Sequence, residues 1–552
     1  SVTSGSLTAV RGAGHAVDRL LERPRYVLTF LAAGQILATV ALAVSVTHNG
    51  WVYFQGGDQI FIATQAWLLG QFTLPPTELG YLWSLVLAPI MWVTGPTYVQ
   101  ALPPLLVFQV LVLGPVALLC VYGIAARIGG RVLGYWAALL WVVAPFAAIP
   151  LFVDRYHERW TEHFLPQALG LTAMSDFPSL VLVLASAYLL VRSLDTSRTG
   201  DAVMAGLLLG AAGGMKPPNL LLGVGAGLAY LVARRWRAAL AFGVAVLPSL
   251  LVLALWKERG LGRLPAFSLE EMQVAAGAGL VAIDVSLDRY VELDLDHFLQ
   301  QMDYLREYFW SARLAQWAPF AGLLAVIRVR RGGIAALLAG WLGAFLLVKG
   351  FSTRADIQAN TFWRLLMPAW PAYVLLFASI PLLVPTLARR LGSRLRPPPV
   401  RPVSSGWIAL VAVVTIAVPV LVTLASSPTD GPESAVWQDE KILTSVESDL
   451  RPRAERIGDG QHITWSSGPW RANVFYRVYR STGPDVECGH RGDSRAVYCD
   501  LSAVPIATTR GTEYVDRDPP EGATYRIGVG TNWADDPGKG DVFVFSPPVT
   551  GP

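Results

Sequence analysis

The chain has 552 residues, of which 53% are hydrophobic and only 15% charged, and its formal net charge is +4. A soluble globular protein carries about a quarter of charged residues, so this composition excludes an ordinary soluble protein. The small net charge gives no reason to expect a nucleic-acid partner. Long apolar runs fill residues 26–425, whereas residues 426–552 have the mixed composition of a secreted domain.

The apolar runs predict a polytopic α-helical membrane protein with about eleven transmembrane helices, since roughly 20 apolar residues cross the hydrocarbon of a bilayer. The predicted spans lie near residues 26–47, 104–126, 132–153, 176–192, 202–214, 217–233, 238–256, 314–328, 333–349, 366–387 and 407–425. Short arginine-rich connections mark the cytoplasmic side. With residues 1–25 as a cytoplasmic tail, every arginine cluster falls inside, and the chain ends outside the plasma membrane. The first span lacks a small-residue cleavage site and is expected to be a signal anchor.

The apolar segment Tyr81–Val93 is short and flanked by prolines. We interpret it as an interfacial or re-entrant helix, because counting it as a span would place Arg127 and Arg131 outside. The alternative is a true span, which would invert everything after it.

The first outer loop, within residues 48–103, contains Gly56-Gly57-Asp58 followed by an apolar pattern over Gln59–Leu69. This pattern predicts an amphipathic helix lying on the bilayer, with Asp58 at its N-terminus. Asp58 is either a helix N-cap or a general base held just above the membrane.

The second outer loop places many ionisable side chains within ten residues, and Asp176 then opens the next span. The members of this group are Asp154, Arg155, His157, Glu158, Arg159, Glu162 and His163. The spacing lacks the His-Glu-x-x-His pattern of zinc enzymes, so a solvated helix face is favoured and no metal or other cofactor is expected. Asp176 either caps its helix or holds an amino group or a sugar hydroxyl.

Two cations are expected at the outer boundary. Lys216 lies in Gly-Gly-Met-Lys-Pro-Pro, where glycine and proline break the helix, and Arg364 lies at the outer start of a later span. Either side chain can simply extend toward the interface. Together they could also form a clamp for an anion such as phosphate.

An Asp-x-Asp motif and three cysteines complete the list of candidates. Asp294 and Asp296 more readily mark a loop-to-helix start than a metal site. Cys120 lies in a span and is expected to be inert, whereas Cys488 and Cys499 are expected to form a disulfide outside the membrane.

Four motifs in this order resemble the GT-C glycosyltransferases, which include aminoarabinose transferases, protein O-mannosyltransferases and actinobacterial cell-wall glycosyltransferases. They are GGDQ at Asp58, SDFPSL at Asp176, GMKPPNLLL at Lys216 and RLLMPAWP at Arg364. The resemblance covers residues 26 to about 425 and implies transfer of a sugar from a polyprenyl phosphate on the outer face. Many relatives carry two adjacent acidic residues in the first loop, whereas Asp58 stands alone here, which weakens the case for a metal.

The resemblance also implies roles. Asp58 would be the general base of an inverting transfer, assisted by Asp176, while Lys216 and Arg364 would stabilise the departing phosphate. Arg155 and Arg159 are further candidates for the donor phosphate. The residues assigned to the sugar or to a glycan, lipid or protein acceptor are His157, Glu158, His163, Trp470 and Trp533.

The C-terminal part is expected to be a polar stalk over residues 426–460, helical from Ser434 to Arg456, followed by a β-domain. The segments HITWSS, NVFYRVYRS, PIATTR and TYRIGVGTN are strand-like, and with the final SPPV they resemble a fibronectin type III sandwich. This domain either binds glycan, through Trp470, Trp533 or Tyr514, or is a structural cap.

Three other functions remain open: a flippase or transporter of lipid-linked saccharides, a polymerase or ligase that joins them, and a binding scaffold. No internal repeat of the kind typical of transporters is found. The arginine-rich and histidine-rich second loop keeps the polymerase alternative open. We expect a monomer, and the excess of arginine over lysine favours an actinobacterial cell-wall role.

Overall fold

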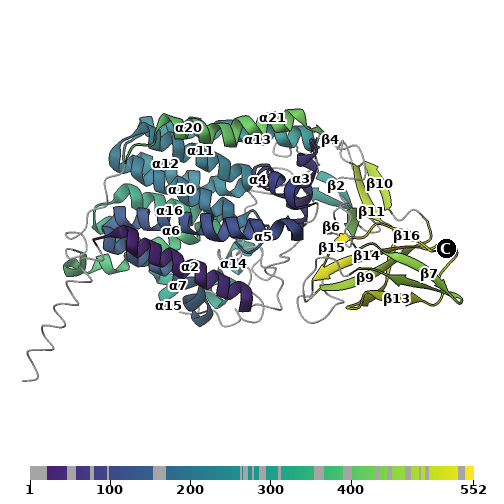
Figure 1. The fold of residues 1–552 in the computed structure, drawn as a ribbon. Coiled ribbons are helices and arrows are strands. Elements are labelled where there is room, and N and C mark those ends of the chain that lie inside the picture. Colours follow the sequence, from purple (N-terminus) through teal and green to yellow (C-terminus); the bar gives the residue numbers. More distant parts are fainter. Residues whose placement is uncertain are drawn as a thin grey trace, which may run out of the picture.

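The computed structural model describes residues 22–45, 58–74, 80–95, 98–152, 170–261, 264, 271–276, 279–284, 294–308, 313–352, 366–388, 401–428, 436–438, 441–443, 450–466, 474–483, 486–490, 497–531 and 541–551. A helical bundle makes up most of this part, and a β-domain lies at one end of it (Figure 1). We refer to the two ends of the bundle as the β-domain end and the opposite end.

Apolar segments of the bundle form helices, several of them continued by short 3-10 or π-helical turns. Their bounds are α2 Pro24–Ser45, α3 Asp58–Gly70, α4 Leu82–Thr94, α5 Tyr98–Phe108, η1 Gln109–Leu113, α6 Gly114–Gly129, α7 Arg131–Phe152, α10 Asp176–Thr196, α11 Thr199–Met215, η2 Pro217–Leu221, α12 Leu222–Val232, α13 Trp236–Leu261, α14 Leu295–Tyr308, α15 Arg313–Arg328, α16 Gly332–Phe351, η5 Met367–Ala369, α18 Trp370–Ser379, η6 Ile380–Leu383, α20 Ser405–Ala412, η7 Val413–Ala417 and α21 Val418–Ala425.

The protein is therefore mostly helical, and a helix lies at each of the predicted span positions. In the described residues, six helices are long and apolar enough to cross a membrane: Pro24–Ala41, Ala101–Gly129, Asp176–Thr196, Trp236–Gly260, Gly332–Phe351 and Ser405–Ala425. The other apolar helices, α4 among them, are shorter. With 13 residues, α4 is about 20 Å long, which is less than the thickness of the hydrocarbon.

Helix α3 begins at Asp58 as predicted, but it does not lie on the surface. Its described side chains are mostly buried, including the polar Gln59 and Gln65, and Gln65 accepts a hydrogen bond of 2.8 Å from Ser84 of α4. A helix that is apolar on nearly all sides is enclosed rather than amphipathic. The described side chains of α3 are therefore mostly enclosed by the protein, and its position on the bilayer stays a prediction.

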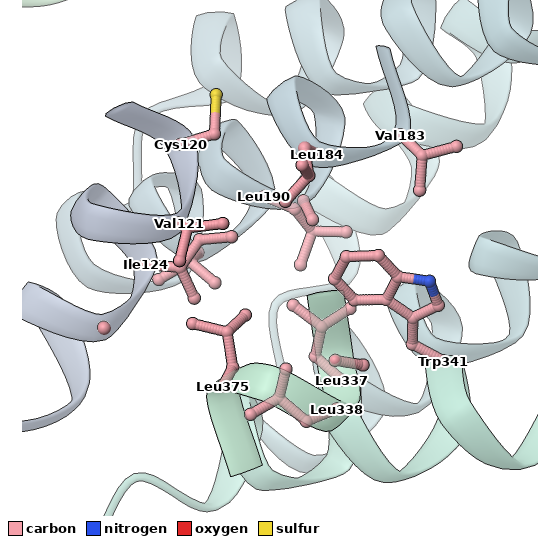
Figure 2. Close-up of a cluster of buried hydrophobic side chains, with 14 of the residues drawn as sticks. Cys120, Val121, Ile124, Val183, Leu184, Leu190, Leu337, Leu338, Trp341 and Leu375 are labelled. Atoms are coloured by element: carbon pink, nitrogen blue, oxygen red, sulfur yellow. The ribbon is translucent and has the colours of Figure 1, made fainter. Parts of the chain in front are cut away.

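Helices α6, α10, α16 and α18 enclose one apolar core (Figure 2). Small residues allow close packing beside this core: a Cβ atom on Gly340 of α16 would lie 2.8 Å from the Cα atom of Gly225 on α12. Such close contacts between small residues are typical of helices packed in membranes. Cys120 of α6 is buried here as a free thiol, and its expected inertness stays a prediction.

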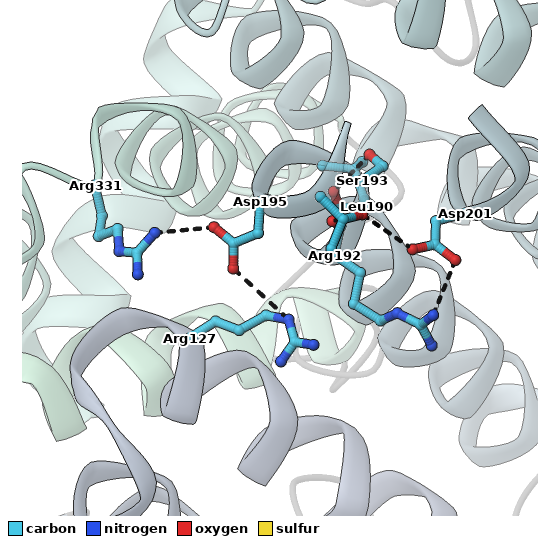
Figure 3. Close-up of polar contacts among 8 residues, drawn as sticks. Arg127, Leu190, Arg192, Ser193, Asp195, Asp201 and Arg331 are labelled. Atoms are coloured by element: carbon cyan, nitrogen blue, oxygen red, sulfur yellow. Dashed lines mark hydrogen bonds and ion pairs between the residues drawn. The ribbon is translucent and has the colours of Figure 1, made fainter. Parts of the chain in front are cut away.

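Ion pairs join the helices at the opposite end of the bundle (Figure 3). Asp195, near the end of α10, pairs with Arg331 at 2.9 Å and with Arg127 of α6 at 3.7 Å. Arg192 of α10 pairs with the fully buried carboxylate of Asp201 on α11 at 3.0 Å. Asp195 and Asp201 thus each have an arginine partner, which offsets the cost of burying these carboxylates.

At the β-domain end, the segment between α13 and α14 contains the hairpin β2 (Glu271–Ala276) and β3 (Gly279–Asp284). The Asp294 carboxylate accepts a hydrogen bond of 2.9 Å from the backbone N–H of His297. Asp294 is therefore a helix N-cap, and the expected loop-to-helix start is confirmed.

The C-terminal part contains antiparallel sheets. Its strands are β4 Ser427–Pro428, β5 Val436–Gln438, β6 Lys441–Leu443, β7 Arg453–Ile457, β8 Gly460–Thr464, β9 Val474–Ser481, β10 Val486–His490, β11 Val497–Leu501, β12 Val504–Thr509, β13 Glu513–Asp516, β14 Thr524–Thr531, β15 Asp541–Phe545 and β16 Val549–Thr550. One sheet has the order β12-β9-β14-β15, with β16 on β14, and another has the order β13-β8-β7. Strand pairing is antiparallel except between β11 and β5 and between β1 (Thr73–Leu74) and β4.

Aromatic side chains fill the space between these two sheets. Trp465 packs edge-on against Tyr476 at 5.6 Å between ring centroids. The Tyr525 hydroxyl donates to the Asp516 carboxylate at 2.8 Å, and Arg480 pairs with the same carboxylate at 2.9 Å. Burial, together with the hydrogen bond to Asp516, raises the pKa of Tyr525 and keeps it neutral as a donor.

The predicted helix from Ser434 to Arg456 is wrong, because strands β5, β6 and β7 lie in that range. Pro452 lacks a backbone N–H and disfavours a helix interior. Strand β6 instead packs against α3, and β1 pairs with β4, so the β-domain contacts the first outer loop.

Cys488 and Cys499 lie directly opposite each other in the antiparallel pair β10–β11. Opposed residues in such a pair have Cα atoms about 4.5–5.5 Å apart, within the range that a disulfide spans.

We predict that denatured but unreduced protein will be alkylated at Cys120 alone, measured by peptide mass spectrometry. Cys120 is the internal control for complete denaturation. Alkylation of Cys488 and Cys499 without a reductant would contradict the disulfide.

Candidate functional site

A carboxylate and an ammonium pair at the β-domain end of the bundle. Asp176 is the first residue of α10, and Lys216 follows the last residue of α11. The two helices are antiparallel neighbours, so these ends meet, and the Lys216 ammonium forms a salt bridge with the Asp176 carboxylate. The carboxylate is 1% exposed and the lysine side chain 11%. The structure thus brings together two of the residues that the sequence selected.

The local sequence explains why Lys216 leaves the helix at this point. Its N–H still bonds to the carbonyl of Ala212 at 2.9 Å, but its backbone is extended, with φ −147° and ψ 101°. A residue before proline avoids helical geometry, and Pro217 follows. The chain then continues as the 3-10 turn η2 into α12, so the lysine stands at a break between two helices.

The first outer loop packs against the same break. A Cβ atom on Gly80 would lie 2.3 Å from the Gly214 carbonyl oxygen, and one on Gly214 would lie 2.7 Å from the Tyr81 hydroxyl. Only glycine permits such a close approach of the two segments. The start of α4 is therefore held next to the residues that precede Lys216.

Hydrogen bonds also join the start of α3 to the segment that leads into Asp176. The N–H of Ala173 donates to the Gln59 side-chain oxygen at 2.8 Å, and the Trp83 indole donates to the Ala173 carbonyl at 2.9 Å. Gln109 donates to the carbonyl of Thr172 at 2.7 Å. These bonds satisfy buried backbone groups and hold the backbone of residue 58 close to the Asp176 segment.

Several predicted site residues cannot be placed against this pair. The backbone of Asp58 is described as the first residue of α3, but its side chain is not. The predicted residues that lie outside the described part of the chain are Arg155, His157, Glu158, Arg159, His163, Arg364, Trp470 and Trp533. Their proposed roles therefore stay predictions.

A third charged group, missed by the sequence analysis, belongs to the same cluster. Lys349 lies in the last turn of α16 and is only 6% exposed. It interacts electrostatically with Lys216, and η2 packs against α16. In the sequence, Lys349 is a single lysine within a long apolar run. This pattern is equally typical of a buried lysine and of one that extends to the membrane–water interface. We refer to Asp176, Lys216 and Lys349 as the two-lysine cluster.

The cluster favours an anion rather than a metal ion. It holds one carboxylate and two ammonium groups, and ammonium groups repel a metal cation. No group of three or more His, Cys, Asp or Glu side chains suitable for a metal is found among the described residues.

No protein-family model matches the chain, and no curated protein matches it. Among solved structures, the oligosaccharyltransferase of Archaeoglobus fulgidus in its apo form is similar at 14% identity with a TM-score of 0.38, over 74% of this chain and 56% of that one. A complex of the Archaeoglobus fulgidus oligosaccharyltransferase AglB with an inhibitory peptide and a dolichol-phosphate is similar at 12% identity and a TM-score of 0.39, over 74% and 57% of the two chains.

The arabinosyltransferase EmbB of Mycobacterium smegmatis is similar at 11% identity with a TM-score of 0.27, over 95% of this chain and 64% of that one. The chain thus spans little more than half the length of the oligosaccharyltransferase and under two thirds of the arabinosyltransferase. Structural similarity to membrane glycosyltransferases is thus present at low sequence identity.

The buried salt bridge yields a stability prediction. Asp176→Asn leaves the Lys216 ammonium without its carboxylate, so we expect the unfolding free energy to fall by about 3 kcal/mol, the usual effect of breaking a buried pair from one side. Thermal unfolding in detergent measures this loss. Adding Lys216→Met should restore much of the stability, and Asp303→Asn on the exposed face of α14 is the matched control. An Asp176→Asn protein as stable as the Asp303→Asn protein would contradict a structural contribution of the pair.

Proposed function

We propose that the chain is a GT-C-type glycosyltransferase that moves a sugar from a polyprenyl phosphate to a glycan, lipid or protein acceptor outside the membrane. The observation that carries this proposal is the two-lysine cluster beside the start of α3, which brings three of the four family-like motifs to one end of the bundle. A lipid-linked donor needs cations for its phosphate at the depth where its tail enters the membrane.

In the proposed reaction, the Asp58 carboxylate removes the proton from the acceptor hydroxyl. The acceptor oxygen then bonds to the anomeric carbon while the bond from that carbon to the phosphate oxygen breaks on the opposite face, so the configuration inverts. Polyprenyl phosphate departs with the electron pair. Lys216 and Arg364 stabilise its growing negative charge, and Asp176 positions Lys216.

We assign the remaining predicted residues to binding. Arg155 and Arg159 would add charge for the donor phosphate, and His157, Glu158 and His163 would contact sugar or acceptor. The β-domain, a fibronectin type III-like sandwich in this proposal, would bind glycan through Trp470 and Trp533. Contact of β6 with α3 supports an acceptor role, because it sets the β-domain against the helix that begins at Asp58.

The main alternative is a flippase or transporter for lipid-linked saccharides. Transporters hold their charged sites near the middle of the membrane. Asp176, Lys216 and Lys349 instead lie at helix ends on one side, where a lipid phosphate would sit. This position favours the transferase. A polymerase or ligase shares the same donor chemistry and differs in its acceptor.

We further propose eleven spans in the plasma membrane, with the N-terminal tail cytoplasmic and the β-domain outside, as the arginine clusters require. A fluorescent protein that folds only in the cytoplasm should stay dark when fused after Pro552. The same reporter fused to a truncated chain ending at Arg235 should fluoresce, since α12 would end on the cytoplasmic side. Fluorescence of the full-length fusion would contradict the proposed topology.

The central prediction concerns Asp58→Asn, which keeps the size of the side chain and most of its capping ability but removes the base. We expect transfer of labelled sugar from polyprenyl phosphate to fall by roughly 10²–10⁴-fold, the usual contribution of a general base. Donor binding and thermal stability should change little, because the base acts on the acceptor. Transfer is measured in nanodiscs, with donor binding recorded in parallel.

Asp294→Asn is the matched control, because Asp294 caps an outer helix and the substitution removes the same charge. It should leave transfer unchanged. Normal transfer by a folded Asp58→Asn protein would refute Asp58 as the base.

A further inference from the structure

A groove of about 650 Å³ lies at the opposite end of the bundle, between α10, α11 and the start of α20. Figure 1 shows α20 beside α11 at this end. Apolar side chains from all three helices line most of the groove: Leu189, Met204, Leu208, Trp407 and Val411. None of them belongs to the two-lysine cluster, so the groove is separate from the candidate site described above.

Positive charge gathers at one end of this groove. Arg192, near the end of α10, and Arg401 and Ser404, which precede α20, line the end nearest the tips of the helices, and no acidic side chain lines the groove. The charge of Arg192 is offset by Asp201 at 3.0 Å. Arg401 is exposed, and its guanidinium forms no ion pair with any described residue. One uncompensated positive charge therefore stands at the mouth of the groove.

The position of Arg401 is fixed by its backbone rather than by its side chain. Arg192 donates a hydrogen bond of 2.8 Å to the Arg401 carbonyl oxygen. The segment also packs closely on α11, since a Cβ atom on Gly200 would lie 3.9 Å from the Val403 carbonyl oxygen. The buried ion pair of Arg192 thus anchors the segment that carries Arg401, while the Arg401 guanidinium stays available to a ligand.

The surrounding sequence adds to this positive charge. Residues 389–401 contain five arginines, and no acidic residue occurs between Asp356 and Asp430. Basic segments next to a membrane span attract anionic lipid headgroups. The local charge is therefore complementary to an anionic partner at the membrane surface.

The rest of the groove suits a lipid chain rather than a soluble anion. No residue of α20 is buried, and Trp407 is 62% exposed, so this helix lies on the outside of the bundle. Tryptophan is enriched at the level of lipid headgroups. From Trp407, the apolar wall continues along α20 to Val411 and along α11 to Leu208. A free phosphate would leave this wall unused, whereas an amphiphile contacts both the wall and the arginine.

We propose that the groove binds an anionic phospholipid, with its phosphate at Arg401 and an acyl chain between α11 and α20. A lipid phosphodiester carries a single negative charge, which Arg401 would neutralise. Ser404 Oγ accepts a hydrogen bond of 3.4 Å from the N–H of Trp407, and its O–H can donate to a phosphate oxygen. The cytoplasmic leaflet as the source of this lipid rests on the proposed topology. The site itself depends neither on that topology nor on transferase activity.

The test titrates the full-length protein in detergent with phosphatidylglycerol and with phosphatidylcholine of the same chain length, read by native mass spectrometry. We expect one phosphatidylglycerol molecule to bind in preference to phosphatidylcholine. Arg401→Gln should lower the affinity for phosphatidylglycerol roughly 5-fold, the usual contribution of one arginine near anionic lipid, and leave phosphatidylcholine unaffected. Arg330→Gln is the matched control, because Arg330 is an exposed arginine at the same end of the bundle and outside the groove.

A second measurement locates the bound lipid. Phosphatidylglycerol with a photoreactive group on its acyl chain should label peptides of α11 and α20 in the unmodified protein. Leu208→Trp fills the groove without changing any charge, so it should reduce both this labelling and the affinity for phosphatidylglycerol. Labelling confined to other helices would overturn the proposed groove, whether or not the Leu208→Trp protein folds.

The remaining outcomes identify other occupants. Equal affinity for the two lipids, or an equal loss in Arg401→Gln and Arg330→Gln, would overturn the proposal in favour of ordinary lipid contact. The melting temperature should rise more with phosphatidylglycerol than with inorganic phosphate. An equal rise would assign the site to a soluble anion and overturn the lipid, and a dimer without bound lipid would assign the groove to a second copy of the chain.

Discussion

Burial of the Asp176 carboxylate beside the Lys216 ammonium is the constraint on which the β-domain end of the bundle depends. A charge taken out of water must meet an opposite charge, so the start of α10 and the end of α11 are held together. The proline after Lys216 ends α11 at that point, and glycines let the first outer loop approach it. Side-chain packing, the end of α11 and the salt bridge therefore together fix the position of Lys216 beside the start of α10.

As a result, segments that are distant in the sequence lie close together at this end of the bundle. Gln59, next to Asp58, bonds to Ala173, three residues before Asp176, and the neighbourhood of Lys216 packs against Tyr81. Buried hydrogen bonds and close backbone contacts fix the start of α3 in this volume.

Hydropathy alone predicted the helical regions correctly, because a bilayer selects long apolar segments and proline and glycine end them. The motifs placed Asp176 and Lys216 on the same predicted side of the membrane. The sequence did not predict their salt bridge, since that depends on how α10 packs on α11. Lys349 was missed because a lone lysine near a helix end has the same sequence signal whether buried or exposed. The predicted helix from Ser434 to Arg456 is wrong because polar strands that pair with distant segments have a weak alternation of polar and apolar residues.

Buried ion pairs lie at both ends of the bundle. At the opposite end, Asp195 and Asp201 are each paired with arginine, as expected where ion pairs join helices. At the β-domain end, the buried carboxylate of Asp176 at the start of α10 pairs with Lys216, which follows the last residue of α11. Pairing of buried charges thus joins α10 to α11 at both ends of these two helices, and it joins α10 to α6 at the opposite end.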